Sequence, residues 1–188
     1  MEDPDPLRQF EAWFAEAQDA GVRVPEAMAV ATATADGAPS VRMVLLKGVD
    51  ERGFVFFTNY ESRKGVELEA NPRAALLFHW EALGRQVRVE GPVERVSAAE
   101  SDAYFSSRPV GSRLGAIASK QSRPLADRAE LERAVEALPD DAPRPDWWGG
   151  YRVRPERYEF WQHRENRLHD RAAYERDGTG WAMQRLYP

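Results

Sequence analysis

The stretch AMAVATATADGAPSVRMVLLK, from Ala27 to Lys47, decides the fold class of this chain. Two β-rich runs, 27–34 and 41–47, flank the dipeptide Asp36-Gly37, which is preferred in tight hairpin turns. The stretch is therefore predicted to form two antiparallel strands joined by a short turn.

Further β-rich runs follow on the C-terminal side, separated by turn residues. Gly91-Pro92 suggests a bulge inside one of them, and Asp177-Gly178 joins the last two. The predicted strands after the hairpin are 54–58, 73–80, 85–96, 151–153, 158–162, 170–176 and 181–186. Short antiparallel strands with a few helices between them predict a mainly β chain. We expect one domain, residues 1–188, folded as a barrel with helices packed on its outside.

Helix signals lie at the N-terminus and between the strands. A helix at about 5–20 has Asp5 as its cap, Pro6 in its first turn and Gly21 beyond its end. Further helices are predicted at 62–70, from the capping box of Ser97 and Glu100 through Phe105, at 112–118 and at 127–138. The acidic, proline-rich segment at about 139–146 is predicted to be a mobile loop.

Composition and charge limit the possible functions. Of 188 residues, 43% are hydrophobic and 30% charged, as in ordinary globular proteins. The absence of cysteine excludes disulfides, thiolate metal sites and cysteine nucleophiles. The net charge of −5 argues against a general binder of nucleic acid or anionic membranes. No membrane-spanning run or signal peptide is evident, so we expect a cytoplasmic protein.

A helix start that breaks a local rule gives the clearest functional signal. In FFTNYESRKG, residues 56–65, Ser62 can cap a helix whose first turn holds Arg63 and Lys64. The helix dipole disfavours cations at this end. A bound phosphate would remove the conflict by accepting hydrogen bonds from the backbone donors and from both cations, so we predict an anion site here.

Two other segments give weaker signals. Arg42 and Lys47, at opposite ends of an apolar strand, could grip a flat ligand with an anionic tail, although edge strands carry such charges to discourage aggregation. Tyr104 and Arg108 are four residues apart and precede Ser112, which would suit a second phosphate. An exposed arginine with ordinary capping serines explains the same pattern.

The C-terminal segment YEFWQHRENRLHDR ends with three nitrogen-rich side chains at alternate positions, Arg167, His169 and Arg171. In an extended segment these side chains share one face and need an anionic partner. A solvated strand face with an ion pair to Glu165 or Asp170 is the ordinary alternative.

Other kinds of site are disfavoured. Gly178-Thr179-Gly180 lacks the later glycine and the setting of a dinucleotide loop. Neighbouring strand residues His169 and Asp170 point to opposite faces, so adjacency gives no catalytic triad. The three histidines lack metal-ligand spacing, so no metal site is expected, and His79 is predicted to be structural.

Eight motifs, taken in order, resemble one family. They are RMVLLK, FFTNYESRK, NPRAALLFHW, RQVRVEG, YFSSRP, SKQS, WWGGYRV, and EFWQ followed by NRLHDR. Over about residues 5–188 the chain resembles the pyridoxamine 5′-phosphate oxidases. The resemblance implies an FMN-binding split β-barrel, antiparallel and Greek-key-like, with flanking helices. It also implies a homodimer with FMN in clefts at the subunit interface.

The resemblance also implies the site residues. FMN would contact Arg42, Met43, Val44, Leu45, Leu46, Lys47, Phe57, Thr58, Arg63, Lys64, Gln86, Gln121, Ser122, Trp161 and Arg171. The phosphorylated B6 substrate would contact Lys47, Tyr104, Arg108, Ser112, Arg167 and His169. Arg167 and His169 would be catalytic, the first pressing the substrate against the flavin and the second orienting or deprotonating it. The anion site predicted at 62–64 becomes the FMN phosphate site.

Three departures from the family pattern stand out. Family members usually carry further residues before the first helix that help to cover the active site, which leaves that cover in question here. His163 replaces the usual glycine after EFWQ. Val110 stands where an arginine usually follows Pro109, and Arg113 is gained.

The implied reaction is oxidation of pyridoxamine or pyridoxine 5′-phosphate by O2 to pyridoxal 5′-phosphate, with release of H2O2. Two alternatives stay open. One is a related FMN oxidase acting on a phenazine precursor, which would not need the phosphate clamp of Tyr104, Arg108 and Ser112. The other is a non-catalytic flavin or B6-phosphate binder. The sequence does not choose between the amine and the alcohol substrate.

Overall fold

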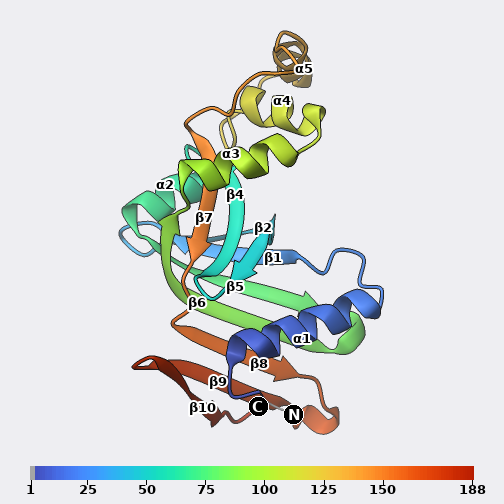
Figure 1. Ribbon diagram of the computed structural model, residues 1–188, viewed down its shortest axis with the longest axis vertical. Helices are drawn as coiled ribbons and strands as arrows, with labels where there is room; N and C mark the ends of the chain where they lie inside the picture. Colours follow the sequence, from blue (N-terminus) through green and yellow to red (C-terminus); the bar gives the residue numbers. More distant parts are fainter. Residues whose placement is uncertain (1–2) are drawn as a thin grey trace.

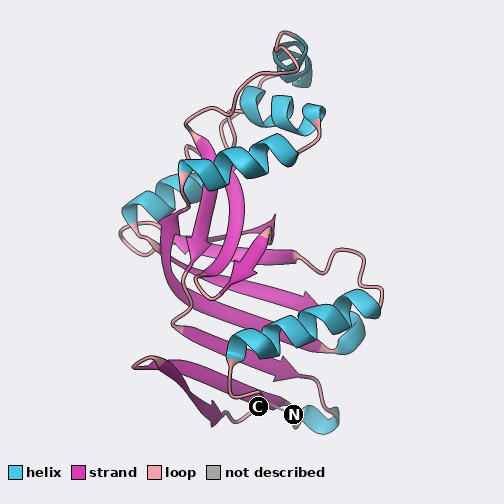
Figure 2. Ribbon diagram, in the orientation of Figure 1, coloured by secondary structure: helices cyan, strands magenta, loops and turns pink. Residues whose placement is uncertain are grey.

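The computed structural model describes residues 3–188, which form ten strands that all pair antiparallel (Figures 1 and 2). The strands are β1 Ala27–Ala33, β2 Pro39–Leu45, β3 Gly48–Asp50, β4 Gly53–Asn59, β5 Arg73–Trp80, β6 Arg85–Arg95, β7 Trp148–Val153, β8 Arg157–Gln162, β9 Asp170–Asp177 and β10 Gly180–Arg185. Seven of them follow the order β10-β9-β8-β6-β5-β1-β2, and β3, β4 and β7 form a second group that joins through β6. The predicted mainly β, antiparallel fold is confirmed.

The hairpin predicted for residues 27–47 forms as β1 and β2, with one difference in its turn. Thr34 N donates to Ala38 O (3.0 Å) and Gly37 N donates to Thr34 O (2.9 Å), so the loop closes over three residues, 35–37. Gly37 has φ 90°, which matches a type I turn followed by a left-handed residue.

β6 is shared by the two groups of strands. Its first half, 85–90, pairs with β8, and its last residues, 93–95, pair with β7. A Cβ at Gly91 would lie 1.9 Å from Arg154 O, so only glycine fits where the partner changes. The predicted bulge at Gly91-Pro92 is wrong for the β5–β6 ladder, because its register continues without an extra residue to Arg73↔Pro92.

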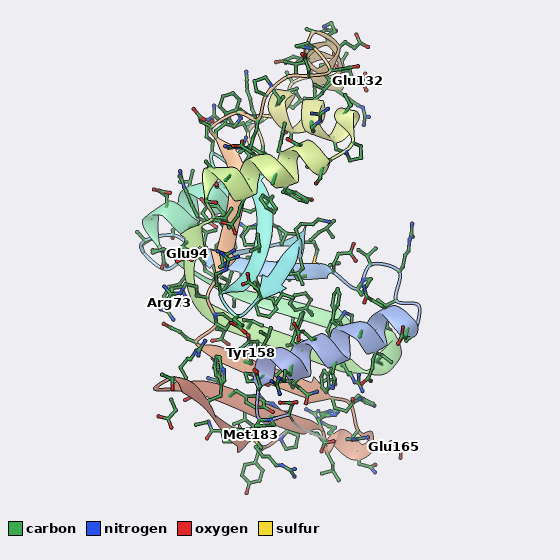
Figure 3. All side chains as sticks on the ribbon, viewed as in Figure 1. Arg73, Glu94, Glu132, Tyr158, Glu165 and Met183 are labelled. Carbon is green, nitrogen blue, oxygen red and sulfur yellow. The ribbon has the colours of Figure 1, made fainter. Side chains whose placement is uncertain are left out.

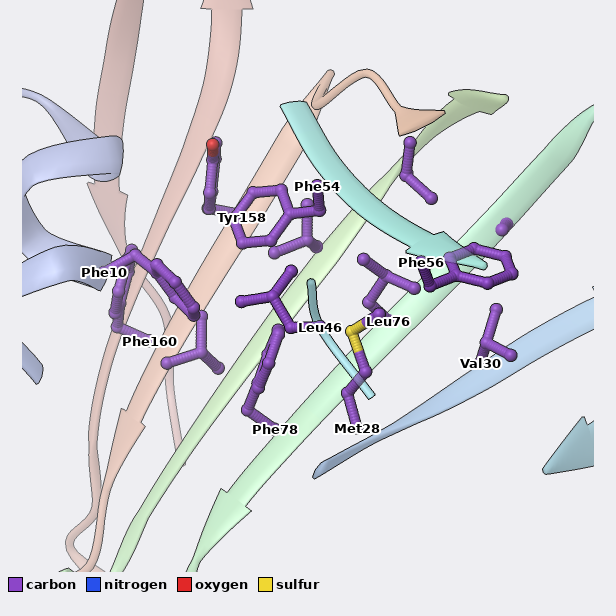
Figure 4. Close-up of a cluster of buried hydrophobic side chains, with 14 of the residues drawn as sticks. Phe10, Met28, Val30, Leu46, Phe54, Phe56, Leu76, Phe78, Tyr158 and Phe160 are labelled. Atoms are coloured by element: carbon purple, nitrogen blue, oxygen red, sulfur yellow. The ribbon is translucent and has the colours of Figure 1, made fainter. Parts of the chain in front are cut away.

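The core lies between the inner face of the large sheet and the strands β4 and β7. Alternate residues of β1, Met28 and Val30, are fully buried, as the period of a strand requires. Helix α1, Pro6–Asp19, is capped by the Asp5 side chain and packs Phe10 into this core, 4.8 Å from Phe54 between ring centroids (Figure 4). Full burial of such a ring contributes about 1.5–3 kcal/mol relative to exposure.

The remaining helices occupy the other end of the molecule. They are α2 Arg63–Ala70, α3 Ala98–Ser107, α4 Val110–Ala118 and α5 Arg128–Glu136. Short 3-10 turns, η1 Glu81–Leu83 and η2 Glu165–Arg167, lie away from these helices, between strands of the large sheet. The capping box of Ser97 and Glu100 forms as predicted. Helix α4 begins two residues earlier than predicted, after Pro109. Helices α4 and α5 project beyond the strands at the top of Figure 1.

The segment predicted to be mobile has specific contacts. Ala142 is buried, and Arg144 donates to an Asp102 carboxylate oxygen (2.6 Å) and to Trp148 O (2.7 Å). Its mobility and the single-domain organisation stay predictions, the second supported by the sharing of β6 between both groups of strands. No helix within residues 3–188 is both long and apolar enough to cross a membrane.

Candidate active site

A cleft of about 840 Å³ opens where β2, β4, α2, α3 and α4 meet. Its lining includes five cationic side chains, Arg42, Lys47, Arg63, Lys64 and Arg108. None of the described residues that line it is acidic. A concave surface with this charge pattern favours an anionic ligand, although the chain as a whole is acidic.

One end of the cleft is the start of α2, where the sequence predicted an anion site. The buried Lys64 Nζ donates to Thr58 Oγ1 (2.9 Å), Gln121 Oε1 (2.9 Å) and Ser62 Oγ (3.1 Å). The Ser62 side chain caps the helix. The structure thus brings together Thr58, Lys64 and Gln121, which the sequence separates by up to 63 residues. Burial and the nearby Arg42 lower the pKa of Lys64 to about 8, while Glu67 opposes that shift.

The long wall of the cleft is β2. This strand is the last in the sheet order, and the consecutive residues 40–45 all line the cleft, as expected where a strand presents an unpaired edge. The strand ends at Leu45, before the end of the predicted run. Leu46 is buried in the hydrophobic core and does not line the cleft, whereas Lys47 does.

Aromatic rings form another part of the cleft lining. Phe57 stacks on Tyr104, with 4.0 Å between ring centroids and 20° between planes. Phe57 also stacks on Trp148, with 5.7 Å between ring centroids. The Arg108 guanidinium lies 4.9 Å from the Trp148 ring, and its buried Nη1 has no hydrogen-bond partner among residues 3–188. Burial raises the pKa of Tyr104. Ser112, in the first turns of α4, also lines the cleft, so the predicted clamp residues do lie together.

The other predicted site residues form a second group away from this cleft. The strand register places Gln86, Trp161 and Arg171 side by side across β6, β8 and β9. His169 lies 4.6 Å from Trp161 between ring centroids. A separate pocket of about 520 Å³ contains His169 and Arg171. Within one chain these residues and the cleft residues line separate pockets, because β2 and β9 lie toward opposite ends of the sheet order.

The turn before β9 also departs from the prediction. Arg167 belongs to η2 and has φ 63°, and β9 begins only at Asp170, so strand alternation does not reach Arg167. Arg171 is paired with Glu159 (2.7 Å) rather than with Glu165 or Asp170. Figure 3 places Glu165, in the same turn as Arg167, at the opposite end of the molecule from Glu132 on α5.

The hydrogen bond at His169 fixes which ring nitrogen can donate. The backbone N–H of Arg164 donates to His169 Nδ1 (3.1 Å), so the neutral ring carries its proton on Nε2. In that form His169 presents a hydrogen-bond donor, which favours an orienting role over proton abstraction.

Two residues near these sites had no usable signal in the sequence. Trp148 is the ring on which Arg108 rests, but the sequence offered no way to distinguish it from Trp147, which is 40% exposed. Glu159 pairs with both Arg171 and Arg88, and only the strand register brings these three together. Both contacts are set by tertiary structure.

Family models match nearly the whole chain. The model described as pyridoxamine 5′-phosphate oxidase matches residues 14–139, and that of the pyridoxine 5′-phosphate oxidase C-terminal dimerisation region matches residues 148–188. The chain belongs to the pyridoxamine 5′-phosphate oxidase family. It is therefore an oxidase of a flavin-dependent family, as the resemblance implied.

Curated relatives in this family are highly similar. The pyridoxine/pyridoxamine 5′-phosphate oxidase of Rubrobacter xylanophilus is 63% identical over 193 residues, covering 99% of this chain and 88% of the relative. The enzyme of the same name from Gluconobacter oxydans is 62% identical over 189 residues, covering 98% and 94%.

Solved structures of the family share the fold. PhzG from Burkholderia lata, in complex with tetrahydrophenazine-1-carboxylic acid, superposes with a TM-score of 0.93 at 36% identity, over 99% of this chain and 94% of that one. A pyridoxamine 5′-phosphate oxidase-related, FMN-binding protein from Nostoc punctiforme gives 0.82 at 18% identity, covering both chains fully, and supports the fold alone. The split-barrel prediction is confirmed.

The departures from the pyridoxamine 5′-phosphate oxidase pattern lie outside the cleft lining. Arg113 does not line the cleft, and its Nη2 donates instead to Asp140 O (3.2 Å). Val110 opens α4 and is 39% exposed. His163 packs beside Gly84, where a Cβ would lie 2.9 Å from the His163 Cβ, and its ring is 5.2 Å from that of His169.

Proposed function

We propose that this chain catalyses FMN-dependent oxidation of pyridoxamine or pyridoxine 5′-phosphate by O2 to pyridoxal 5′-phosphate, with release of H2O2. The observation that carries the proposal is the cleft with five cations, no acidic side chain among its described lining, and two separate polar clusters, one around Lys64 and one around Arg108. Cofactor and substrate each bring one phosphate, so a cleft for both needs two anion sites.

The residues at the start of α2 fit the FMN phosphate. Arg63 and Lys64 supply charge, and Thr58 and Gln121 already surround the Lys64 ammonium group. Ser122, which lines the same end, has φ 73°. The edge of β2 would lie along the flat flavin ring. When bound, FMN supplies the redox chemistry by accepting a hydride from the substrate carbon and delivering the electrons to O2.

The cluster around Arg108 fits the substrate phosphate. The buried Nη1 of Arg108 has no hydrogen-bond partner in the described part of the chain, which is costly unless an anion accepts its hydrogen bond. Tyr104 and Ser112 add hydroxyl donors, and Lys47 adds a further cation. This arrangement favours a phosphorylated substrate over an uncharged one.

A second copy of the chain would complete the site. Directly paired strand residues share a face, so Gln86, Trp161 and Arg171 lie on the same sheet face as Leu77 and Met43. Met43 is 65% exposed, and its neighbours Val41 and Leu45 are also exposed. An open apolar sheet face suits an obligate interface, and the matched dimerisation region lies on the strands beside it. We therefore place FMN between two protomers, with Arg167 and His169 supplied by the partner.

Within the completed site, Arg167 would hold the substrate ring against the flavin. The Nε2–H of His169 would donate to a substrate oxygen or nitrogen and set its orientation. Arg167 and Asn166 both have left-handed φ values, 63° and 56°, which costs energy in non-glycine residues and is common at functional sites.

Two alternatives are to be tested, and one of them has support from a solved structure. The PhzG likeness favours a tricyclic phenazine precursor as substrate. The higher identity to the B6 oxidases and the cluster of Tyr104, Arg108 and Ser112 favour the phosphorylated substrate. A non-catalytic flavin or B6-phosphate carrier is the second alternative.

An aerobic assay separates these functions. Purified protein with FMN is given pyridoxine phosphate, pyridoxamine phosphate or a dihydrophenazine acid, and both H2O2 and the aldehyde product are followed. We expect aldehyde and H2O2 from at least one B6 phosphate. Turnover of the dihydrophenazine acid alone would support the phenazine oxidase, and no turnover of any substrate by FMN-loaded protein would support the carrier.

Hybrid dimers test whether the cleft is shared. Arg108→Met and Arg167→Lys are placed on differently tagged chains, and the heterodimer is purified. We expect each homodimer to have little activity and the heterodimer to recover about half of the wild-type activity, because one of its two clefts is then fully native. A heterodimer as inactive as both parents would place Arg108 and Arg167 in the cleft of the same chain.

The affinity for FMN is expected to fall as the pH rises through about 8. Above this pKa the free protein holds Lys64 neutral, so binding the phosphate requires uptake of a proton. The loss should approach a factor of about ten per pH unit. Flavin fluorescence titrations from pH 7 to 9.5 check this, with riboflavin as the control because it lacks the phosphate. An identical pH dependence for both ligands would contradict the role of Lys64.

A further inference from the structure

A buried carboxylate stands directly behind the FMN phosphate end of the cleft. Glu67, on α2, has a side chain only 4% exposed and does not line the cleft itself. Its oxygens accept hydrogen bonds from Thr32 and Ser40 on the β1–β2 hairpin, the second at 2.5 Å. They also accept from Arg63 Nε (2.8 Å) and Arg42 Nη2 (3.3 Å). One acidic group therefore has four donors around it.

The two arginines differ in how freely they could move without this carboxylate. Arg63 is 62% exposed, and Glu67, one helical turn further on, holds its Nε. Arg42 is held at both ends of its guanidinium, because Nη1 and Nη2 also donate to Thr32 Oγ1 and Ser40 Oγ, each at 2.5 Å. Those two hydroxyls in turn donate to Glu67, so the carboxylate organises both arginines.

The charges in this region explain why such a group is needed. Arg42, Arg63 and Lys64 all line the same cleft. Neighbouring like charges repel one another when no anion is bound, and the charge of Arg42 lowers the pKa of Lys64. Glu67 is the negative group in direct contact with two of them. Without it, extended rotamers that take Arg63 into solvent would be favoured.

We propose that Glu67 is a positioning residue that orients Arg42 and Arg63 toward the phosphate of the bound flavin. It touches neither ligand, and it acts by fixing the guanidinium groups before the phosphate arrives, which removes part of the entropy cost of binding. The inference deepens the proposed function and rests on its FMN site.

The ionisation of the carboxylate supports this role. Burial raises its pKa, but the hydrogen bonds from Ser40, Thr32, Arg63 and Arg42 outweigh burial and lower the pKa to about 2. Glu67 is therefore an anion at every pH at which the protein would work. Its charge also opposes the downward pKa shift of Lys64, so it helps to keep that ammonium group protonated.

Comparison of FMN with riboflavin tests the proposal, because the two ligands differ only in the phosphate. Dissociation constants for both are measured for the wild type, Glu67→Ala, Glu67→Gln and the control Glu69→Gln. Glu69 lies on the same helix but faces solvent and pairs with Arg95. For Glu67→Ala we expect FMN binding to weaken by about tenfold, in the range of couplings within one hydrogen-bonded network, with riboflavin binding unchanged. Glu67→Gln keeps the shape and one acceptor oxygen, so it should lose less.

Each other outcome has a definite meaning. Equal weakening for both flavins would mean that Glu67 only ties α2 to the hairpin. Unchanged FMN binding would mean that Glu67 does not position the arginines, and tighter FMN binding would mean that its negative charge opposes the phosphate. Each of these results overturns the proposal. Thermal unfolding is recorded in parallel, and if Glu67→Ala fails to fold, the FMN-to-riboflavin ratio of Glu67→Gln decides, with a ratio equal to that of the wild type overturning the proposal. Wild-type protein that binds FMN no better than riboflavin would refute the FMN phosphate site itself, a result distinguishable from failure of Glu67 alone.

Discussion

Replacing Arg108 with methionine is expected to lower kcat/KM for pyridoxamine 5′-phosphate by about 100-fold or more, with FMN binding retained. Arg108 is the half-buried cation beside the aromatic rings of the cleft, over the Trp148 ring, and its buried Nη1 has no hydrogen-bond partner among the described residues. Losing one member of a buried, hydrogen-bonded charge pair costs about 2–5 kcal/mol, and 2.7 kcal/mol corresponds to about 100-fold. Methionine keeps most of the apolar contact with Trp148, so folding should be preserved.

Steady-state kinetics with the flavin-loaded enzyme measure this effect, and Arg113→Met is the matched control. Arg113 lies five residues further along, but its guanidinium contacts Asp140 O outside the cleft lining. The control should change kcat/KM less than about threefold, as for substitutions away from a site. Similar losses in both variants would mean that Arg108 does not hold the substrate phosphate.

Replacing Arg167 with lysine is expected to remove about 2–4 kcal/mol of transition-state stabilisation while FMN stays bound. Lysine keeps the charge but lacks the planar guanidinium that can lie flat over a substrate ring. The left-handed backbone at Arg167 is unchanged by this substitution, so its strain is the same in both proteins. The loss should therefore come from the side chain alone.

Single-turnover flavin reduction, followed by absorbance, measures that loss directly. Arg164→Lys provides the control, because Arg164 lies in the same turn and its side chain pairs with Asp170 (2.7 Å). Its backbone N–H still donates to His169 after the substitution. Unchanged reduction rates in Arg167→Lys would remove Arg167 from the catalytic role.

The parts of the fold that were predictable depend on neighbouring residues. The β1–β2 hairpin follows from alternation and the Asp36-Gly37 turn, and α2 follows from the Ser62 cap. The first residues of β7 were missed because Gly149 and Gly150 carry little strand propensity. Glycine is required at Gly149 by tertiary packing, because a Cβ there would lie 2.2 Å from the Tyr60 hydroxyl oxygen.

In the candidate site, too, the features set by neighbouring residues were predictable and those set by distant contacts were not. The anion site at the start of α2 was predictable because its conflict with the helix dipole lies within one helical turn. The contact of Gln121 with Lys64 spans 57 residues and entered only through the family motifs. The shared face of Arg167, His169 and Arg171 was mispredicted because Asn166 and Arg167 take left-handed conformations, which ends strand alternation. A single chain also gives no view of residues that a second copy would supply.

The sharing of β6 between two groups of strands sets an order of events during synthesis on the ribosome. β6 can pair with β5 as soon as both emerge, since they are joined by a short turn. Its other edge pairs with β7 and β8, which begin at Trp148 and Arg157, more than 50 residues later. Until then that edge and the apolar residues behind it stay uncovered, so the nascent chain is most vulnerable to aggregation while residues 96–147 are being made.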